Sequence, residues 1–369
     1  MKYIVRQAGI TALCFVCLYS LLLGLALILS PTSVHKGSLD LNTAADTIYL
    51  TSPKYAMLGR YVLDVPDQKV LLIGASNTGV GFKQGNIQSA FPCAKISNLS
   101  IGFSNISEVR QMIDLVHEVQ DKFAQRTNTF VIGIWYGMFV DTELHWPNAD
   151  RNRGDTDLDI ERYRYGFYRR TPKGPVAVLP INWLPAEAVL IRPYLLVEKI
   201  ARELTLRLRY AVFIRPPILT DADRETRVVN DKDKSDAFAY WKEAMGGKNA
   251  ISGTQAALLQ DVIERLLDAG EKVVVADLPI PAWHREGSPY QAIYERLIQD
   301  EIFDHFRGRS GFAALKMDDL GLDENYSDEV HPRPHVASIW TARLISVIQS
   351  LMSPCEPAVG QNSSAQHRS

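Results

Sequence analysis

A serine in a glycine-rich turn and a distant Asp-x-x-His pair are the side chains of this sequence best suited to chemistry. Ser76 lies in VLLIGASNTGVGF, residues 70–82, directly after four apolar residues. Asp328 and His331 lie in NYSDEVHPRPH, residues 325–335. A serine becomes a nucleophile when a base accepts its proton and an acid orients that base. These residue types therefore allow a Ser–His–Asp relay.

The glycine-rich turn has two other interpretations. A phosphate-binding loop of the G-x-x-x-x-G-K-[ST] type needs a lysine and a hydroxyl residue after its second glycine, but Val80 and Gly81 stand there. The dinucleotide-binding spacing G-x-G-x-x-G is absent too. The remaining alternative is structural, because Ser76 could simply satisfy backbone groups of a tight turn.

Other histidines have simpler interpretations. Asp114 and His117 repeat the D-x-x-H spacing inside a predicted helix, where they face the same way and are interpreted as a surface pair. His335 falls in the first turn of the last predicted helix. Trp283 and His284 follow a predicted strand and could line a cleft. The pair in the 325–335 loop could likewise be structural.

Short apolar segments alternate with amphipathic ones along the chain. The predicted strands are 70–73, 95–99, 129–135, 272–278 and 312–317. The predicted helices are 104–123, with Ser104 or Ser107 as its cap, 252–269, 289–306 and 335–351. This alternation is typical of an α/β fold in which helices flank a parallel sheet in three layers. Ligands of such sheets bind beyond the carboxyl ends of the strands, where Ser76 is expected.

The composition is that of a globular protein. It is 46% hydrophobic and 22% charged, and its net charge of −2 gives no reason to expect a nucleic-acid partner. Cys14 and Cys17 form a C-x-x-C inside an apolar run, so they are interpreted as packing residues, and neither a metal nor another cofactor is predicted. Cys93 and Cys355 could form a disulfide, although sequence alone cannot place them within reach of each other.

The N-terminal run is long enough to cross a membrane. Residues 8–29 are 22 residues without a charge, and about 20 suffice to span a bilayer. Lys2 and Arg6 precede the run, so the positive-inside rule places the N-terminus in the cytoplasm and the remainder outside. A cleaved signal peptide is the alternative, although its apolar region is usually shorter. We expect a cytoplasmic stub and inner-membrane anchor at 1–30, a linker at 31–66, one domain at 67–352 with an insertion at about 140–250, and a disordered tail at 353–369.

Three blocks of the sequence resemble the SGNH (GDSL-like) hydrolase superfamily. They are Ser76 after the first strand, Gly102 in NLSIGFS after the second, and Asp328-x-x-His331 before the last helix. The resemblance covers residues 68–352 outside the insertion. It implies that Ser76 is the nucleophile, that His331 is its base and that Asp328 orients the base. It also implies that backbone N–H groups of Ser76 and Gly102, with an asparagine side chain, bind the oxyanion.

Two blocks depart from the family pattern. The usual G-D-S reads G-A-S, which removes no member of the triad. The third block, usually G-x-N-D, reads GIWY at residues 133–136 and has no asparagine. Asn77 or Asn105 could supply the missing oxyanion donor, and loss of one such donor can cost about 10²–10³ in rate. These departures are similar to those of membrane-tethered relatives that act on envelope polymers, such as the D-alanyl transfer protein of teichoic acid synthesis and the alginate O-acetylation proteins.

The resemblance implies an extracytoplasmic serine acyltransferase or esterase. It would act on O-acyl groups, acetyl above all, of a cell-envelope or exported polysaccharide through an acyl-Ser76 intermediate. Its partners would be that polysaccharide, the membrane and a multi-span acyl-donating membrane protein. Two alternatives are an inactive glycan-binding or assembly protein of this fold and a scaffold that acts through the insertion. The run ERYRYGFYRR, residues 161–170, could grip a sugar polymer or form a solvated surface.

Overall fold

A five-stranded parallel sheet forms the centre of the molecule. The structure, a computed structural model, describes residues 2–29, 52–58, 63, 67–120, 128–141, 157–172, 174–180, 183–212 and 221–352. The strand order is β2-β1-β3-β6-β7, and every neighbouring pair is parallel. The strands are β1 Lys69–Gly74, β2 Lys95–Asn98, β3 Asn128–Ile134, β6 Lys272–Asp277 and β7 Phe312–Lys316. The predicted α/β class with a parallel sheet is thus confirmed.

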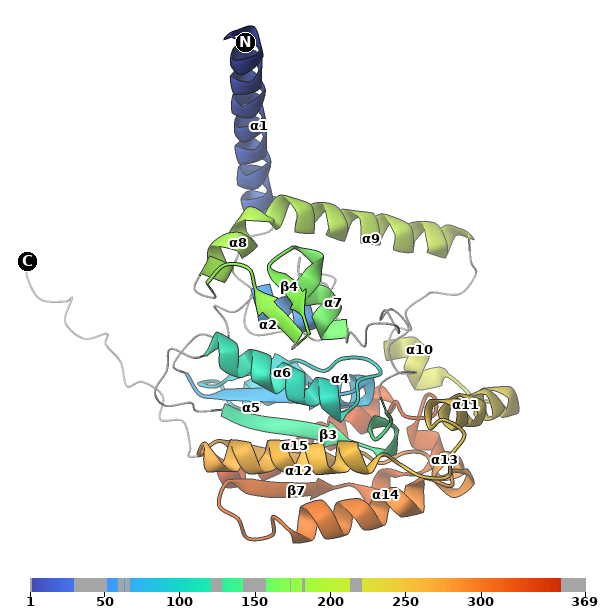
Figure 1. Ribbon diagram of the computed structural model, residues 1–369. Coiled ribbons are helices and arrows are strands. Elements are labelled where there is room, and N and C mark those ends of the chain that lie inside the picture. Colours follow the sequence, from blue (N-terminus) through green and yellow to red (C-terminus); the bar gives the residue numbers. More distant parts are fainter. Residues whose placement is uncertain are drawn as a thin grey trace, which may run out of the picture.

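Four helices cover the two faces of this sheet. Helices α6 and α12 pack together on one face, whereas α5 and α15 pack together on the other (Figure 1). They are α5 Gln84–Ala90, α6 Ile106–Val119, α12 Gly253–Asp268 and α15 Pro334–Leu351. Because β1, β3 and β6 have helices on both sides, their residues read as continuous apolar runs and are almost all buried.

Shorter helices join these elements. They are α4 Ser76–Gly81, η3 Tyr136–Met138, α13 Ala282–Gly287, α14 Gln291–Ile298, η7 Asp318–Leu320 and η8 Asp323–Asn325. The predicted helix 289–306 changes type along its length, because α14 is followed directly by the π-helical segment η6 Gln299–Asp304. Gly270 follows the end of α12 and takes the left-handed conformation there, with φ 77°, as is common for glycine just after a helix.

The segment predicted as an insertion, 140–250, adds helices and a hairpin to the sheet domain. It contains α7 Asp157–Arg164, the antiparallel strands β4 Tyr168–Thr171 and β5 Gly174–Ala177, α8 Leu184–Leu190, α9 Arg192–Val212, α10 Asp221–Thr226 and α11 Asp231–Ala244. In Figure 1, α7, α8, α9 and the hairpin lie above α6, whereas α10 and α11 lie to the right, near α13.

The expected linker, 31–66, contains a folded element. Helix α2 Ser52–Leu58 packs against α6, and its last three side chains are buried in the core. This part of the linker prediction is therefore corrected, since apolar burial makes α2 part of the domain. Apart from α2 and the buried Leu63, positions 31–66 lie outside the described residues, as does the predicted tail, 353–369.

The N-terminal helix α1, Lys2–Leu29, stands out from the domain (Figure 1). Its most apolar window has a mean hydropathy of 2.7, and its 28 residues correspond to about 42 Å at 1.5 Å per residue. It is therefore long and apolar enough to cross a membrane, which fits a single-pass anchor or a signal sequence. Cys14 and Cys17 are exposed on it. Cys355 lies outside the described residues, so its pairing with Cys93 stays a prediction.

Candidate active site

Ser76 is held at the end of β1 by the close approach of α4 to the strands. A Cβ atom at either Gly74 or Gly133 would lie 2.2 Å from the Thr78 Oγ1 atom, so only glycine leaves room for this helix. Gly74 also has φ 155°, at the edge of the range that favours glycine. The two glycines are partners in the β1–β3 register. The glycine-rich turn therefore serves to seat the first turn of α4, which begins with Ser76, on the sheet.

Asp328 and His331 lie in a tight loop before α15. One carboxylate oxygen of Asp328, Oδ1, accepts hydrogen bonds from the backbone N–H groups of Val330 (3.0 Å) and His331 (2.8 Å). The N–H of Ser327 donates to the carbonyl oxygen of His331 (3.0 Å). An Asp side chain that bonds to nearby N–H groups stabilises this kind of turn. The loop thereby fixes the orientation of both functional side chains.

Three predicted residues come together at the end of the sheet. Because a carboxylate only accepts, the Nδ1–H of His331 donates to Asp328 Oδ2, at 2.8 Å. The other ring nitrogen, Nε2, then accepts from the Ser76 hydroxyl, also at 2.8 Å. The exposed fractions of the side chains are 23% for His331 and 16% for Asp328. The arrangement has the connectivity of a nucleophile, a base and an orienting acid.

Electrostatics couples the two ionisable members of this relay. Burial raises the pKa of Asp328, but the charge and hydrogen bonds of His331 and the loop N–H groups outweigh it and lower that pKa to about 2. Burial lowers the pKa of His331, but the Asp328 carboxylate outweighs it, so the net shift is upward from the usual 6.5. Asp328 is therefore ionised at neutral pH, as orientation of the Nδ1–H requires.

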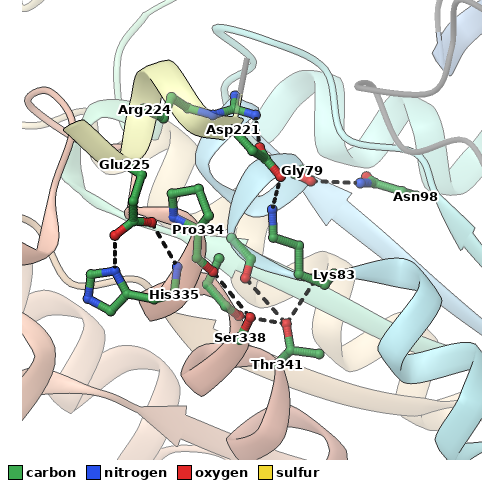
Figure 2. A network of polar contacts seen from close by, with 12 residues as sticks. Gly79, Lys83, Asn98, Asp221, Arg224, Glu225, Pro334, His335, Ser338 and Thr341 are labelled. Carbon is green, nitrogen blue, oxygen red and sulfur yellow. Dashed lines mark hydrogen bonds and ion pairs between the residues drawn. The ribbon is translucent and has the colours of Figure 1, made fainter. Parts of the chain in front are cut away.

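The triad loop is tied to α10 by Arg333. Its guanidinium donates to the backbone carbonyl oxygens of Arg224 and Glu225 and, at 2.7 Å, of Arg227. Figure 2 shows the neighbouring contacts, in which Glu225 accepts from the ring of His335 and the α10 carboxylate Asp221 pairs with Lys83. His335 is thus a first-turn residue of α15, as predicted, and it is exposed.

Ser76 and His331 open into a small cavity of about 160 Å³. Its walls come from the ends of β1 and β3, the loop after β2, the triad loop and helix α11 of the insertion. The lining residues are Ala75, Ser76, Phe103, Ser104, Trp135, Gly137, Trp241, Glu329, Val330 and His331. The wall is mainly apolar, and the insertion contributes to it through Trp241.

Of the predicted oxyanion residues, only Ser76 is among the residues that line the cavity. Gly102 does not line the cavity; the next residue, Phe103, lines it and takes the left-handed conformation, with φ 59°. Such a conformation is costly for a bulky residue and is often found at functional sites. A Cβ atom at Gly102 would meet only open space, so the turn does not need glycine there.

Neither asparagine lines the cavity either. Asn105 is the cap of α6, in place of the predicted Ser104 or Ser107: its Oδ1 accepts from the N–H of Glu108 (3.2 Å) and its Nδ2 donates to the Val140 carbonyl (3.2 Å). Its amide is therefore already used. Asn77 accepts from the N–H of Thr78 (3.0 Å), and its buried Nδ2 has no partner among the described residues.

Two residues of the cavity wall carry buried donors that were not predicted. The hydroxyl of Ser104 and the indole N–H of Trp135 are both buried, and neither has a hydrogen-bond partner in the described part of the chain. A buried polar group without a partner costs free energy and suggests a functional reason for its presence. Trp135 occupies the asparagine slot of the third block, GIWY. The sequence could have suggested Trp135 as an oxyanion donor through this position, because an indole N–H donates a hydrogen bond as an asparagine amide does.

A second polar pair lies behind the cavity wall. His284 donates from Nδ1 to the Glu329 carbonyl (2.8 Å), so its Nε2 accepts from the Tyr136 hydroxyl (2.5 Å). Burial lowers the pKa of His284 to about 4, which keeps the ring neutral. His284 and Trp283 are not among the lining residues, contrary to the interpretation that they line the cleft. Glu329 lines the cavity, and burial and the Asp328 charge raise its pKa.

The remaining sequence candidates have structural roles. Asp114 pairs with Arg265 (3.4 Å), whereas His117 faces Glu271 (2.9 Å), so this D-x-x-H is not a mutual pair. The run 161–170 is not among the residues that line the cavity. Tyr165 donates to Glu198 of α9 and Tyr168 to Glu118 of α6, and Phe167 and Tyr168 are buried. The run packs α7 and β4 onto the domain. Within the described ranges, no group of three or more His, Cys, Asp or Glu side chains is placed to hold a metal ion.

The geometry therefore brings together Ser76, His331 and Asp328 at a small cavity, and it adds Ser104 and Trp135 as unpaired donors. Comparison of the whole chain with protein-family models and with curated proteins finds no match.

Proposed function

We propose that this protein is a membrane-anchored serine acyltransferase or esterase of the SGNH type, which acts outside the cytoplasm on O-acyl groups of a cell-envelope or exported polysaccharide. The observation that carries the proposal is the relay from Asp328 through His331 to a Ser76 hydroxyl that lines a cavity. An inactive glycan-binding protein has no need to keep a histidine ring aimed at a serine, so this geometry favours the enzyme.

The chemistry follows from the hydrogen bonds. The Ser76 oxygen attacks the ester carbonyl carbon while His331 Nε2 accepts the hydroxyl proton, and the C=O pair moves onto oxygen. Collapse of this tetrahedral intermediate breaks the C–O bond to the leaving alcohol, which takes the proton from His331. A second hydroxyl, deprotonated by His331, then attacks the acyl-Ser76 ester. The bond from the acyl carbon to Ser76 Oγ breaks, and Oγ takes the proton back from His331. Water as acceptor gives an esterase, and a sugar hydroxyl gives a transferase.

The size of the cavity supports a small acyl group. Its volume of about 160 Å³ compares with about 30 Å³ for one water in the liquid and about 300–1,000 Å³ for sites that enclose drug-sized ligands. An acetyl group fits inside a cavity of this volume. The helix α1 supports a site held near a membrane, where the polymer would be a tethered or exported substrate.

The test is active-site labelling of the full-length protein in nanodiscs with a fluorophosphonate serine probe. We expect wild type to be labelled and Ser76→Ala and His331→Ala to lose labelling. Matched controls are Ser338→Ala and His305→Ala, since both side chains are exposed outside the cavity and should keep wild-type labelling. Folded wild type that does not react would contradict the proposal and favour the inactive binding protein. Intact mass after p-nitrophenyl acetate treatment then detects the acyl-Ser76 ester.

A further inference from the structure

Helix α9 has its apolar side on the outside of the molecule. Tyr194, Val197, Leu204, Leu208 and Val212 recur at spacings of three, four or seven residues, so they lie along one face of the helix. Each of these side chains is more than half exposed, with exposed fractions from 53% to 72%. In a water-soluble domain, the apolar face of an amphipathic helix packs on the core instead.

The side of α9 that packs on the domain carries Leu195, which is fully buried in the core, and Glu198, which pairs with groups of neighbouring helices. Glu198 accepts from Lys54 of α2 at 2.9 Å, a lysine whose side chain is only 2% exposed. Glu198 also accepts from the Tyr165 hydroxyl (3.2 Å), and Arg164 lies 3.4 Å from it. These contacts fix the rotation of α9 about its own axis, so its apolar face is held away from the sheet.

The candidate membrane helix lies against the start of α9. Helices α1 and α9 pack together, and the Tyr19 hydroxyl of α1 donates to the Leu190 carbonyl at the junction of α8 and α9. Tyr19 lies inside the uncharged run 8–29, not in the polar sequence after it. Tyr19 stands 10 residues before Leu29, the end of this run, which is about 15 Å of helix. Because the run is the part of α1 that would lie in the bilayer, the contact places the start of α9 in the outer leaflet, beside α1.

The direction and composition of α9 suit the same location. In Figure 1, α9 runs crosswise to α1, between α1 and the rest of the domain. A helix in this position lies in the plane of a membrane that α1 crosses. Five basic and two acidic residues lie in α9, and Trp183, 57% exposed, lies just before α8. Basic residues and tryptophan are both common at the membrane–water interface.

We propose that the apolar face of α9 contacts lipid in the outer leaflet of the bilayer that α1 crosses, so the domain is held to the membrane at two places. This goes beyond the proposed acyl-transfer activity and rests only on the part of the proposed function in which α1 is a retained membrane anchor. We favour lipid as the partner of this face because α9 begins beside α1. A second protein or a second copy of this chain could cover the face only where the bilayer does not.

The test uses the full-length protein in nanodiscs made of equal parts phosphatidylcholine and phosphatidylglycerol. Spin labels are placed at Leu204→Cys and Leu208→Cys, after replacement of Cys14, Cys17, Cys93 and Cys355. The matched control is Ile293→Cys, an exposed apolar position on α14, which lies at the far side of the sheet domain from α9 (Figure 1). Collision rates with oxygen, which concentrates in lipid, and with a polar nickel chelate, which stays in water, are then measured.

We expect the ratio of oxygen to nickel collisions to be several-fold higher at the two α9 labels than at the α14 label. A ratio equal to that of the control would overturn the proposal, because the face would then be in water. Exclusion of both reagents would overturn it too, since a protein would cover the face. A second variant carries Leu204→Glu and Leu208→Glu with the label at Val197→Cys; we expect nickel accessibility there to rise, while the exposed substitutions leave the fold intact.

Discussion

Replacing Trp135 by phenylalanine should slow acyl transfer while leaving the fold intact. The substitution removes the indole N–H, which is buried without a partner among the described residues, and keeps an aromatic ring in contact with Trp241, 4.6 Å away between ring centroids. Loss of one oxyanion donor costs about 10²–10³ in rate, or about 2.7–4 kcal/mol. We therefore expect the rate of Ser76 acylation to fall by about two to three orders of magnitude.

The free energy of unfolding of the Trp135→Phe variant is expected to change little. A buried unpaired donor costs about 1–3 kcal/mol, and phenylalanine removes that cost. The smaller ring also loses packing contacts, at roughly 0.8 kcal/mol per methylene-sized group. The two changes oppose each other, so the free energy of unfolding should change by less than about 1 kcal/mol. A large rate loss with little change in Tm is thus the signature of a functional donor.

The assay is the pseudo-first-order rate of fluorophosphonate labelling, together with thermal unfolding of the same sample. The matched control is Trp340→Phe, because the Trp340 indole N–H is also buried without a partner in the described part of the chain but lies outside the cavity. Its labelling rate should stay at the wild-type value. A Trp135→Phe rate within about threefold of wild type would refute the reasoning, given the larger loss expected for an oxyanion donor. A large loss in Ser104→Ala would then assign the role to that hydroxyl.

Three further outcomes are expected. The labelling rate should rise with pH as His331 loses its proton, because the base acts only when it is neutral. The midpoint should lie above 6.5, since the pKa of His331 is raised. A rate that does not change between pH 5 and 9 would contradict this. Gly133→Ala should lower the free energy of unfolding by about 1–3 kcal/mol or more, because the new Cβ atom would lie 2.2 Å from Thr78 Oγ1. Adding Thr78→Ala removes that contact and should recover part of the loss in chemical unfolding. Arg333→Ala should speed backbone hydrogen exchange across α10, because it removes the bonds from Arg333 to carbonyl oxygens at the end of that helix. The control Arg343→Ala breaks an exposed ion pair worth about 0–1 kcal/mol and should leave this exchange unchanged. Equal exchange in both variants would show that Arg333 does not hold α10.

The sheet and the triad loop were predictable because local patterns determine them. Buried parallel strands leave continuous apolar runs, and the turn after β1 leaves glycines where α4 approaches the strands closely. The Asp-x-x-His spacing follows from a short loop in which Asp328 bonds to the N–H of His331. The contact of His331 with Ser76 joins residues 255 positions apart, so the sequence suggested it only through the family resemblance.

The parts that could not be predicted depend on contacts with distant segments. Asn105 caps α6 because its amide also reaches the Val140 carbonyl, which a local rule for serine caps does not detect. The helix α2 is short and followed a polar stretch, so only its burial against α6 identifies it as part of the domain. The periodicity of α9 predicts an amphipathic helix but not which face is outside, since ion pairs with α2 and α7 decide that.

The order of the strands also has a consequence for how this chain folds as it is made. Strands β3 and β6 are neighbours at the centre of the sheet, yet the 137 residues from 135 to 271 separate them in the chain. At about 5–20 residues per second, synthesis of that segment takes roughly 7–30 s. For this time β3 has no partner on one side, and an unpaired apolar strand edge is prone to aggregation. Chaperones that hold nascent chains should therefore bind this chain most strongly before β6 has been made.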